Sequence, residues 1–209
     1  DEIRDEDTLD IAISNWLDNI SSVDYKIKET HEYTMILPES YYGPGSYSNW
    51  IRVGWALAST DSKMLLTWIK FSSQSKEFDW NDIPELFETW KSFDFDNPDN
   101  LTYRSIMYWA KRTSPIEYSK IRENTVDYFI GQSLSGTEFD LANVLFNIYK
   151  DEFVCVSIKN NCWYEYRNNR WYEIDSGNSL RIKISTTMHD EYFNRVQKAT
   201  DKLTLIDHD

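Results

Sequence analysis

The segment Trp50-Ile51-Arg52-Val53-Gly54-Trp55-Ala56-Leu57 decides how this chain folds. Its apolar residues recur at the i, i+3, i+4 and i+7 spacing, which places them on one face of an α-helix. Gly54 lies in the middle of this face, although glycine costs a helix about 1 kcal/mol relative to alanine. The segment therefore predicts a buried helix that another part of the chain approaches closely at Gly54.

The same helical spacing recurs downstream as far as residue 134. The four further stripes are Met64, Leu65, Trp68 and Phe71; Ile83, Leu86, Phe87 and Trp90; Tyr103, Ile106, Met107 and Ala110; and Tyr118, Ile121, Thr125 and Phe129. A capping box from Asp82 to Glu85 is predicted to begin the second of these helices, and Pro115 begins the last. We expect residues 46–134 to form a five-helix bundle with its tryptophans in the core.

Upstream of the bundle, residues 1–45 have a different character. Leu9, Ile13 and Leu17 share a helical face after an acidic start. The stretch 25–45 is rich in β-forming residues and is closed by Pro38 and by Gly43-Pro44-Gly45. We expect an N-terminal helix followed by a strand-bearing or extended insertion.

Ser135-Gly136 is the predicted boundary of a third segment, 135–209. There Thr137 is predicted to cap a helix, and three β-type runs follow, ending with Ile158, Tyr166 and Ile174. Asn160-Asn161 and Asn168-Asn169 separate the runs and suit two-residue hairpin turns, because asparagine tolerates positive φ. These turns predict a three-stranded antiparallel meander. The expected pairs are Ile158 with Trp163, Cys155 with Tyr166, Tyr166 with Trp171, and Arg167 with Arg170.

A final helix is expected after this meander, because Leu180, Ile184, Met188 and Tyr192 recur every four residues. The alternation of Leu180, Ile182 and Ile184 leaves a strand open there. The predicted fold class is α+β and mostly α: a helical bundle followed by a helix, a meander and a helix.

The charge is distributed unevenly along the chain. Residues 1–99 hold 20 Asp and Glu against 8 Lys and Arg, a balance of −12, whereas residues 100–200 hold 12 against 13, a balance of +1. The first half would repel a phosphate backbone, and the second half could contact one locally. This composition excludes an autonomous, high-affinity nucleic-acid binder.

Two cysteines, Cys155 and Cys162, are too few for a disulfide framework, and the predicted register does not pair them. A reducing, intracellular setting is expected. No apolar stretch is long enough to span a membrane, and the start without Met suggests a segment of a longer protein.

Catalytic motifs are not found in the sequence. There is no GxxxxGK[ST] phosphate loop and no GxSxG elbow, and the three histidines are far apart, so neither cofactor nor zinc is expected. Asp94-Phe95-Asp96 could share a divalent metal as in a nucleotidyltransferase, but an acidic loop between helices is the favoured interpretation. We expect no enzyme activity from this chain.

Two blocks resemble parts of viral replication proteins. The first joins the segment 50–57 to Trp68-Ile69-Lys70-Phe71-Ser72-Ser73-Gln74-Ser75-Lys76 and to Trp90. It resembles the helical C-terminal domain of primases in the primase–helicases of large DNA viruses and phages. The second joins Tyr149–Val154, Trp163–Tyr166 and Arg170-Trp171. It resembles the small domain before the superfamily 3 helicase motor in poxvirus-type primase–helicases. The stretch 25–45 departs from the family as an insertion.

This resemblance implies a non-catalytic connector or collar between a primase and a hexameric helicase. ATP and Mg²⁺ would then be bound only by other domains of the parent protein, which would act as a homo-hexamer in the host cytoplasm or a viral replication compartment. The fragment alone would bind single-stranded DNA weakly or not at all, and no membrane. The alternative is a stand-alone acidic domain that binds a basic partner or mimics DNA, motivated by the balance of −12 in residues 1–99.

The candidate nucleic-acid contacts form two groups. In the second hairpin, Arg167 and Arg170 could bind phosphate while Tyr166 and Trp171 stack on bases. Lys111 and Arg112, at the end of a predicted helix, are the other group. For the hairpin, the favoured structural interpretation places the aromatic side chains in the core and the arginines in solvent at the tip. For Lys111 and Arg112, it explains their position by the favourable interaction of cations with a helix C-terminus.

Overall fold

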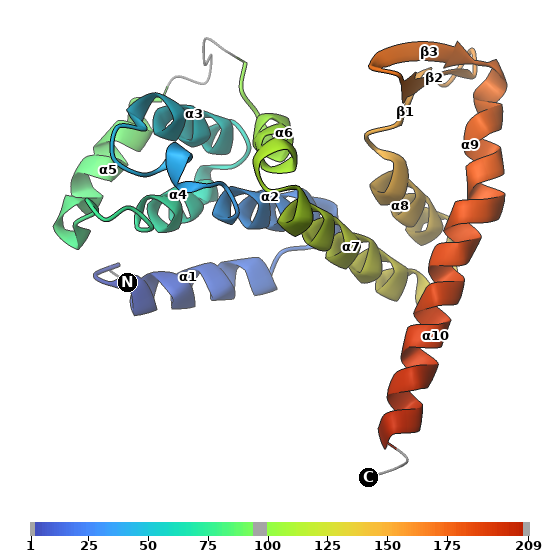
Figure 1. The fold of residues 1–209 in the computed structure, drawn as a ribbon, viewed down its shortest axis with the longest axis horizontal. Helices are drawn as coiled ribbons and strands as arrows, with labels where there is room; N and C mark the ends of the chain where they lie inside the picture. Colours follow the sequence, from blue (N-terminus) through green and yellow to red (C-terminus); the bar gives the residue numbers. More distant parts are fainter. Residues whose placement is uncertain (1–2, 94–99, 207–209) are drawn as a thin grey trace. The chain divides into compact units, whose positions relative to one another are not determined.

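The computed structural model describes residues 3–93 and 100–206. The chain forms two compact units, Asp1–Arg122 and Glu123–Asp209. The fold is mostly α-helical with one three-stranded antiparallel sheet, as predicted (Figure 1). The predicted boundary at Ser135-Gly136 lies inside the second unit, where Gly136 takes a φ of 71° in a turn before the next helix. None of the helices in the described part of the chain has the length and apolar character to cross a bilayer.

The first unit is built from helices. These are α1 (Glu6–Asp18), α2 (Tyr25–Met35), α3 (Tyr47–Ala58), α4 (Leu65–Ser72), α5 (Ile83–Lys91), α6 (Tyr103–Thr113) and the start of α7 (Pro115–Gln132), with 3-10 turns at Ser22–Asp24, Glu39–Tyr41, Ser62–Met64 and Trp80–Asp82. Each of the five predicted apolar stripes between residues 50 and 129 coincides with one of these helices.

An aromatic core confirms the close approach predicted at Gly54. Trp68 of α4 is completely buried and stacks on Trp50 of α3, with 4.6 Å between ring centroids. Trp90 of α5 and Phe93 pack on the same ring at 5.7 Å and 5.2 Å. A Cβ at Gly54 would lie 2.9 Å from both Trp68 and Phe93, so only glycine leaves room for these rings.

The prediction of a strand-bearing or extended insertion at 25–45 is wrong, because residues 25–35 form α2. Tyr33 is fully buried and stacks on Tyr118 of α7 at 4.7 Å, and Ile27 is buried in the same core. Every turn of this helix has buried residues, and their packing outweighs the β propensity of Tyr33-Thr34-Met35-Ile36. The helix ends at Met35, and Pro38 precedes the 3-10 turn Glu39–Tyr41.

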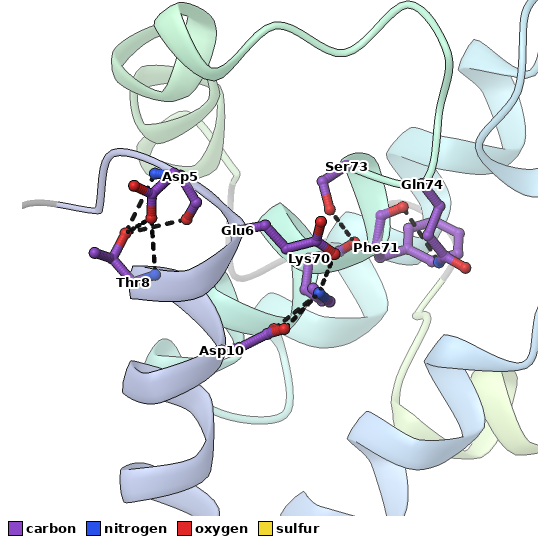
Figure 2. A network of polar contacts seen from close by, with 8 residues as sticks. All are labelled: Asp5, Glu6, Thr8, Asp10, Lys70, Phe71, Ser73 and Gln74. Carbon is purple, nitrogen blue, oxygen red and sulfur yellow. Dashed lines mark hydrogen bonds and ion pairs between the residues drawn. The ribbon is translucent and has the colours of Figure 1, made fainter.

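The acidic N-terminal helix is an integral part of the first unit. Leu9 and Ile13 are buried against Ile69 of α4. Beside this contact, Lys70 Nζ forms ion pairs with Glu6 at 2.7 Å and with Asp10 at 2.8 Å (Figure 2). Burial of Lys70 opposes its charge, but the hydrogen bonds and negative charges of Asp10 and Glu6 prevail and raise its pKa. Two acidic residues therefore hold α1 on α4.

Of the two helix N-caps predicted from the sequence, at Asp82 and Thr137, the structure confirms the one at Thr137. The predicted capping box at Asp82 is wrong, because Asp82 makes no side-chain bond to the helix and Asp79 accepts from the Asn81 amide one turn earlier. The 3-10 turn Trp80–Asp82 moves the capped position upstream. In the second unit Thr137 Oγ1 does accept from the Asp140 amide, as predicted.

The second unit combines helices with the sheet. After the end of α7 come α8 (Glu138–Tyr149), β1 (Phe153–Ser157), β2 (Cys162–Arg167), β3 (Arg170–Ile174), α9 (Asn178–Lys183), a π-helical segment (Ile184–Met188) and α10 (His189–Ile206), with 3-10 turns at Ser133–Ser135 and Asp175–Gly177. Its small core joins Tyr149, Phe153 and Leu180, with Trp163 and Ile174 packed against them. The open choice between strand and helix after Leu180 is settled as helix.

The predicted meander is confirmed, but its first hairpin has another register. Cys155 pairs with Trp163 and Ser157 with Cys162, with a bulge between Cys155 and Ser157. The predicted pairs of Ile158 with Trp163 and Cys155 with Tyr166 are therefore wrong. The turn is longer than predicted, and only Asn161 of its asparagine pair has positive φ, at 49°. The cysteines are not cross-strand partners, as predicted, and both are free.

The final helix is not uniform. Between α9 and α10, residues 184–188 form a π-helical segment, which takes up one more residue per turn than an α-helix. Leu180 and Met188 on either side are both buried. Farther along, the Tyr192 hydroxyl is 2.6 Å from Ser133 Oγ, which attaches α10 to the end of α7.

Candidate nucleic-acid interface

The second hairpin carries four of the six candidate residues, and the structure confirms its register. β2 and β3 are neighbouring strands of the sheet (Figure 1). Across them, Tyr166 pairs with Trp171 and Arg167 with Arg170. Asn168 and Asn169 form the two-residue turn with φ of 50° and 59°, the left-handed values that this kind of turn requires. Both arginines therefore flank the tip of the hairpin.

The four residues do not converge on one site. Successive side chains of a strand point to opposite faces, so Arg167 and Arg170 lie on one face and Tyr166 and Trp171 on the other. The Tyr166 and Trp171 rings contact each other, with 5.1 Å between centroids. A single nucleotide cannot be held between that pair and the arginines, which corrects the combined site expected from the sequence.

Tyr172 is the residue that the sequence analysis missed. It lies on the arginine face, because it is two residues from Arg170, and its ring centroid is 4.8 Å from Arg167 Cζ. Its side chain is 36% exposed. The period of two in a strand was the signal that could have found it, since Arg167, Arg170 and Tyr172 share a face once the register is fixed. We call these three residues the arginine face.

The aromatic face of the hairpin tip is exposed rather than buried. Tyr166 is 41% and Trp171 48% exposed, which contradicts the favoured interpretation that these rings are core. The packed part of the sheet is its other end, where Trp163 and Ile174 contact the small core that contains Phe153. The other half of that interpretation holds, because both arginines are exposed at the tip.

Electrostatics leave the arginine face positive. Two carboxylates lie on these strands. Glu173 is on the opposite face, where it accepts from the Tyr164 hydroxyl at 3.2 Å. Glu165 is on the arginine face and accepts from Ser179 Oγ at 3.2 Å, so two arginines there face one carboxylate. Within the described ranges 3–93 and 100–206, neither arginine forms an ion pair. Like charges opposite each other destabilise a strand pair, and a bound anion would relieve that cost.

Lys111 and Arg112 form a separate group at the end of α6, in the first unit. Arg112 Nη1 donates to the Tyr108 hydroxyl at 2.9 Å, and its Cζ lies 5.5 Å from the Tyr108 ring centroid. Lys111 Nζ lies 5.9 Å from the Tyr118 ring centroid. Both cations also suit the helix C-terminus, so their position has a structural explanation without any ligand.

No metal centre is found in the part of the chain that the structure describes, since no three His, Cys, Asp or Glu residues come together. Asp94 and Asp96, the metal candidates from the sequence, lie outside the described residues. His31 is partly buried in the first unit, where its Nδ1 lies 2.9 Å from Thr67 Oγ1, and burial lowers its pKa to about 4. In the hairpin, burial and the nearby Glu173 carboxylate raise the pKa of Cys162, which disfavours the nucleophilic thiolate.

Comparison with known proteins identifies the first unit. Residues 31–110 match the family model described as Primase C terminal 2 (PriCT-2), and all of them lie within the unit Asp1–Arg122. The match begins inside α2, which the sequence analysis placed outside the bundle. Residues 31–110 are thus similar to primase C-terminal domains. Such domains are the non-catalytic part of a primase, in agreement with the expectation that this chain is not an enzyme.

Particular relatives are viral. The chain is 34% identical over 150 residues to "Putative helicase L207/L206" of Acanthamoeba polyphaga mimivirus, 29% over 155 residues to "Putative primase C962R" of African swine fever virus, and 25% over 142 residues to "Putative helicase 022R" of Frog virus 3. These matches cover 71%, 68% and 65% of this chain but only 15%, 16% and 14% of the relatives. The chain is homologous to a short segment of viral primase and helicase proteins.

Proposed function

We propose that this chain is a connector segment in a viral replicative primase–helicase, placed between a primase and a superfamily 3 helicase motor. The observation that carries the proposal is the match of residues 31–110 to a primase C-terminal domain, together with relatives whose names divide between primase and helicase. The described units fit this role, since they offer packed cores and surface contacts rather than a convergent catalytic cleft. ATP and Mg²⁺ would be bound by the other domains of the parent protein.

The parent protein would act as a homo-hexamer, with this segment as a collar beside the motor, in the host cytoplasm or a viral replication compartment. In that position a surface of the second unit would meet single-stranded DNA. The arginine face supports this part of the proposal, because Arg167 and Arg170 can bind phosphates while Tyr172 offers a ring to a base. The aromatic pair Tyr166 and Trp171 offers a further exposed stacking surface on the opposite side.

Titration of the chain with a fluorescently labelled oligo-dT, followed by anisotropy at about 50 and 200 mM salt, tests the DNA contact. We expect weak, salt-sensitive binding that is lost in the double variant Arg167→Ala/Arg170→Ala. Each phosphate contact that is lost lowers the slope of log K against log salt by about 0.7 for single strands, so two contacts lower it by about 1.4.

The matched control removes two exposed lysines of the first unit, Lys63→Ala/Lys76→Ala, and changes the net charge equally. If the control weakens binding as much as the arginine variant, only net charge matters and the arginine face is not the contact. The connector role is tested separately. Joined to the flanking domains of its parent protein, the segment should be required for coupled priming and unwinding, and its replacement by a flexible linker of equal length should abolish that coupling.

A further inference from the structure

A hollow in the first unit has the lining of a binding site. It has a volume of about 250 Å³ and lies among the loop after α2, the start of α3, the end of α4 and the start of α5. Its lining residues are Tyr42, Gly43, Gly45, Ser46, Tyr47, Trp50, Ser72, Ser75, Glu77, Phe78, Asp82 and Leu86. Pockets for drug-sized ligands measure about 300–1,000 Å³, so this hollow suits one side chain or a group of similar size.

Its aromatic wall is fixed in advance of any ligand. The Trp50 Nε1 proton is donated to Ser72 Oγ at 2.8 Å, and the indole stacks on the buried Trp68 ring at 4.6 Å. Tyr47 stands beside Trp50, with 5.7 Å between the ring centroids, and is 69% exposed. Two aromatic side chains thus line the hollow, and Trp50 needs little further ordering on binding because Ser72 and Trp68 already hold it.

The charged residues of the lining are all acidic. Glu77 and Asp82 contribute carboxylates, and no lysine, arginine or histidine lines the hollow. In the described part of the chain, neither carboxylate forms an ion pair or a side-chain hydrogen bond. The surrounding residues 1–99 carry a balance of −12, so the local field favours a cation and disfavours a phosphate.

We propose that this hollow binds the guanidinium or ammonium group of a basic peptide segment from a partner protein. The cation would lie against Trp50 and Tyr47 and pair with Glu77 and Asp82. Aromatic rings attract cations through their negative faces, and carboxylates at the rim neutralise the charge. This site lies in the first unit and is independent of the DNA contact proposed for the arginine face.

The test uses blocked five-residue peptides of glycine and serine with one central arginine, lysine or citrulline. Binding is followed by NMR at the Trp50 indole N–H, which a Trp50→Phe variant assigns. We expect the arginine and lysine peptides to shift this signal with a Kd of about 1 mM, as befits a single side chain. The uncharged citrulline peptide should bind at least about tenfold more weakly, because it keeps the shape and loses the charge.

The variant Glu77→Gln/Asp82→Asn should weaken the arginine peptide at least about threefold, and Tyr47→Ser should do so by a similar factor. The control Asp7→Asn/Glu117→Gln makes the same charge change at exposed residues that do not line the hollow and should leave the affinity unchanged. Unchanged NMR chemical shifts of the indole N–H protons of the other tryptophans show that each variant is folded. Equal binding of citrulline, an equal effect of the control, or a Trp50 shift caused by single-stranded DNA instead of the peptides would overturn the proposal.

Discussion

Replacing Gly54 by alanine sets two physical effects against each other. In an exposed helix this change gains about 1 kcal/mol, because alanine restricts the unfolded chain and favours the helix. At Gly54 the new methyl group would lie 2.9 Å from atoms of both Trp68 and Phe93, nearer than carbon atoms can pack. Trp68 is fully buried and wedged against Trp50 and Trp90, so it has no free space to move into.

Overpacking of this kind costs about 1–3 kcal/mol, and two clashing rings place Gly54→Ala in the upper part of that range. After subtraction of the helix gain, we expect a net loss of about 1–2 kcal/mol. With a urea slope near about 2 kcal/mol/M, the unfolding midpoint falls by about 0.5–1 M. Tryptophan fluorescence is a suitable probe, because seven of the nine tryptophans belong to the unit Asp1–Arg122.

Gly131→Ala is the matched control. It is also a helical glycine, at the end of α7, but the nearest atom to its new Cβ would be Arg195 Nη2 at 3.9 Å, an ordinary contact. Its stability, followed by circular dichroism, should stay equal or rise by up to about 1 kcal/mol. If Gly54→Ala were as stable as the parent chain, the close approach of the rings at Gly54 would be refuted.

Two further predictions concern the first unit. Because the pKa of His31 falls from an ordinary 6.5 to about 4 in the folded state, the unfolded state binds more protons between these values, so stability should fall by about 3 kcal/mol as the pH drops from 6.5 to 4. Urea midpoints should fall less steeply with decreasing pH for His31→Gln than for the parent chain. Equal slopes for the two proteins would show that His31 does not cause this pH dependence. Lys70→Met should cost about 1 kcal/mol and speed amide hydrogen exchange in α1, since it removes both ion pairs to Glu6 and Asp10. Lys91→Met, which removes one exposed pair to Glu88, is the control, and equal exchange in α1 for both variants would show that Lys70 does not hold that helix.

Helices with a clear apolar stripe could be predicted from the sequence, because their buried residues recur at the spacing of an α-helix. The stripes at 50–57 and 103–110 are buried in α3 and α6 as expected. Residues 25–35 could not be predicted, since Tyr33 and Ile27 are favourable in strands and become helical only through contact with distant α7 and α6. Propensity is local, whereas this packing is not.

In the sheet, the outcome depended on turn length. Asn168-Asn169 was a sufficient signal, because both residues take positive φ and fix the register of β2 and β3. Asn160-Asn161 was not, because a bulge beside Ser157 changes the count of residues in the first hairpin. For the candidate site, the alternation of side chains between the two faces of a strand was not applied in the sequence analysis. The period of two separates Tyr166 and Trp171 from the arginines, and that period was available in the sequence.

The π-helical segment at 184–188 explains why four residues of the last helix are spaced by four rather than by 3.6. Over the three repeats from Leu180 to Tyr192, an ideal α-helix would drift by about 120°, and a π turn absorbs one residue, or about 100° of that rotation. The segment therefore acts as an insertion that the helix has accommodated without breaking. A homologue lacking one residue here would have a regular α-helix and would keep its counterpart of Tyr192 facing Ser133, so alignments of this region should place a gap within 184–188 rather than in a loop.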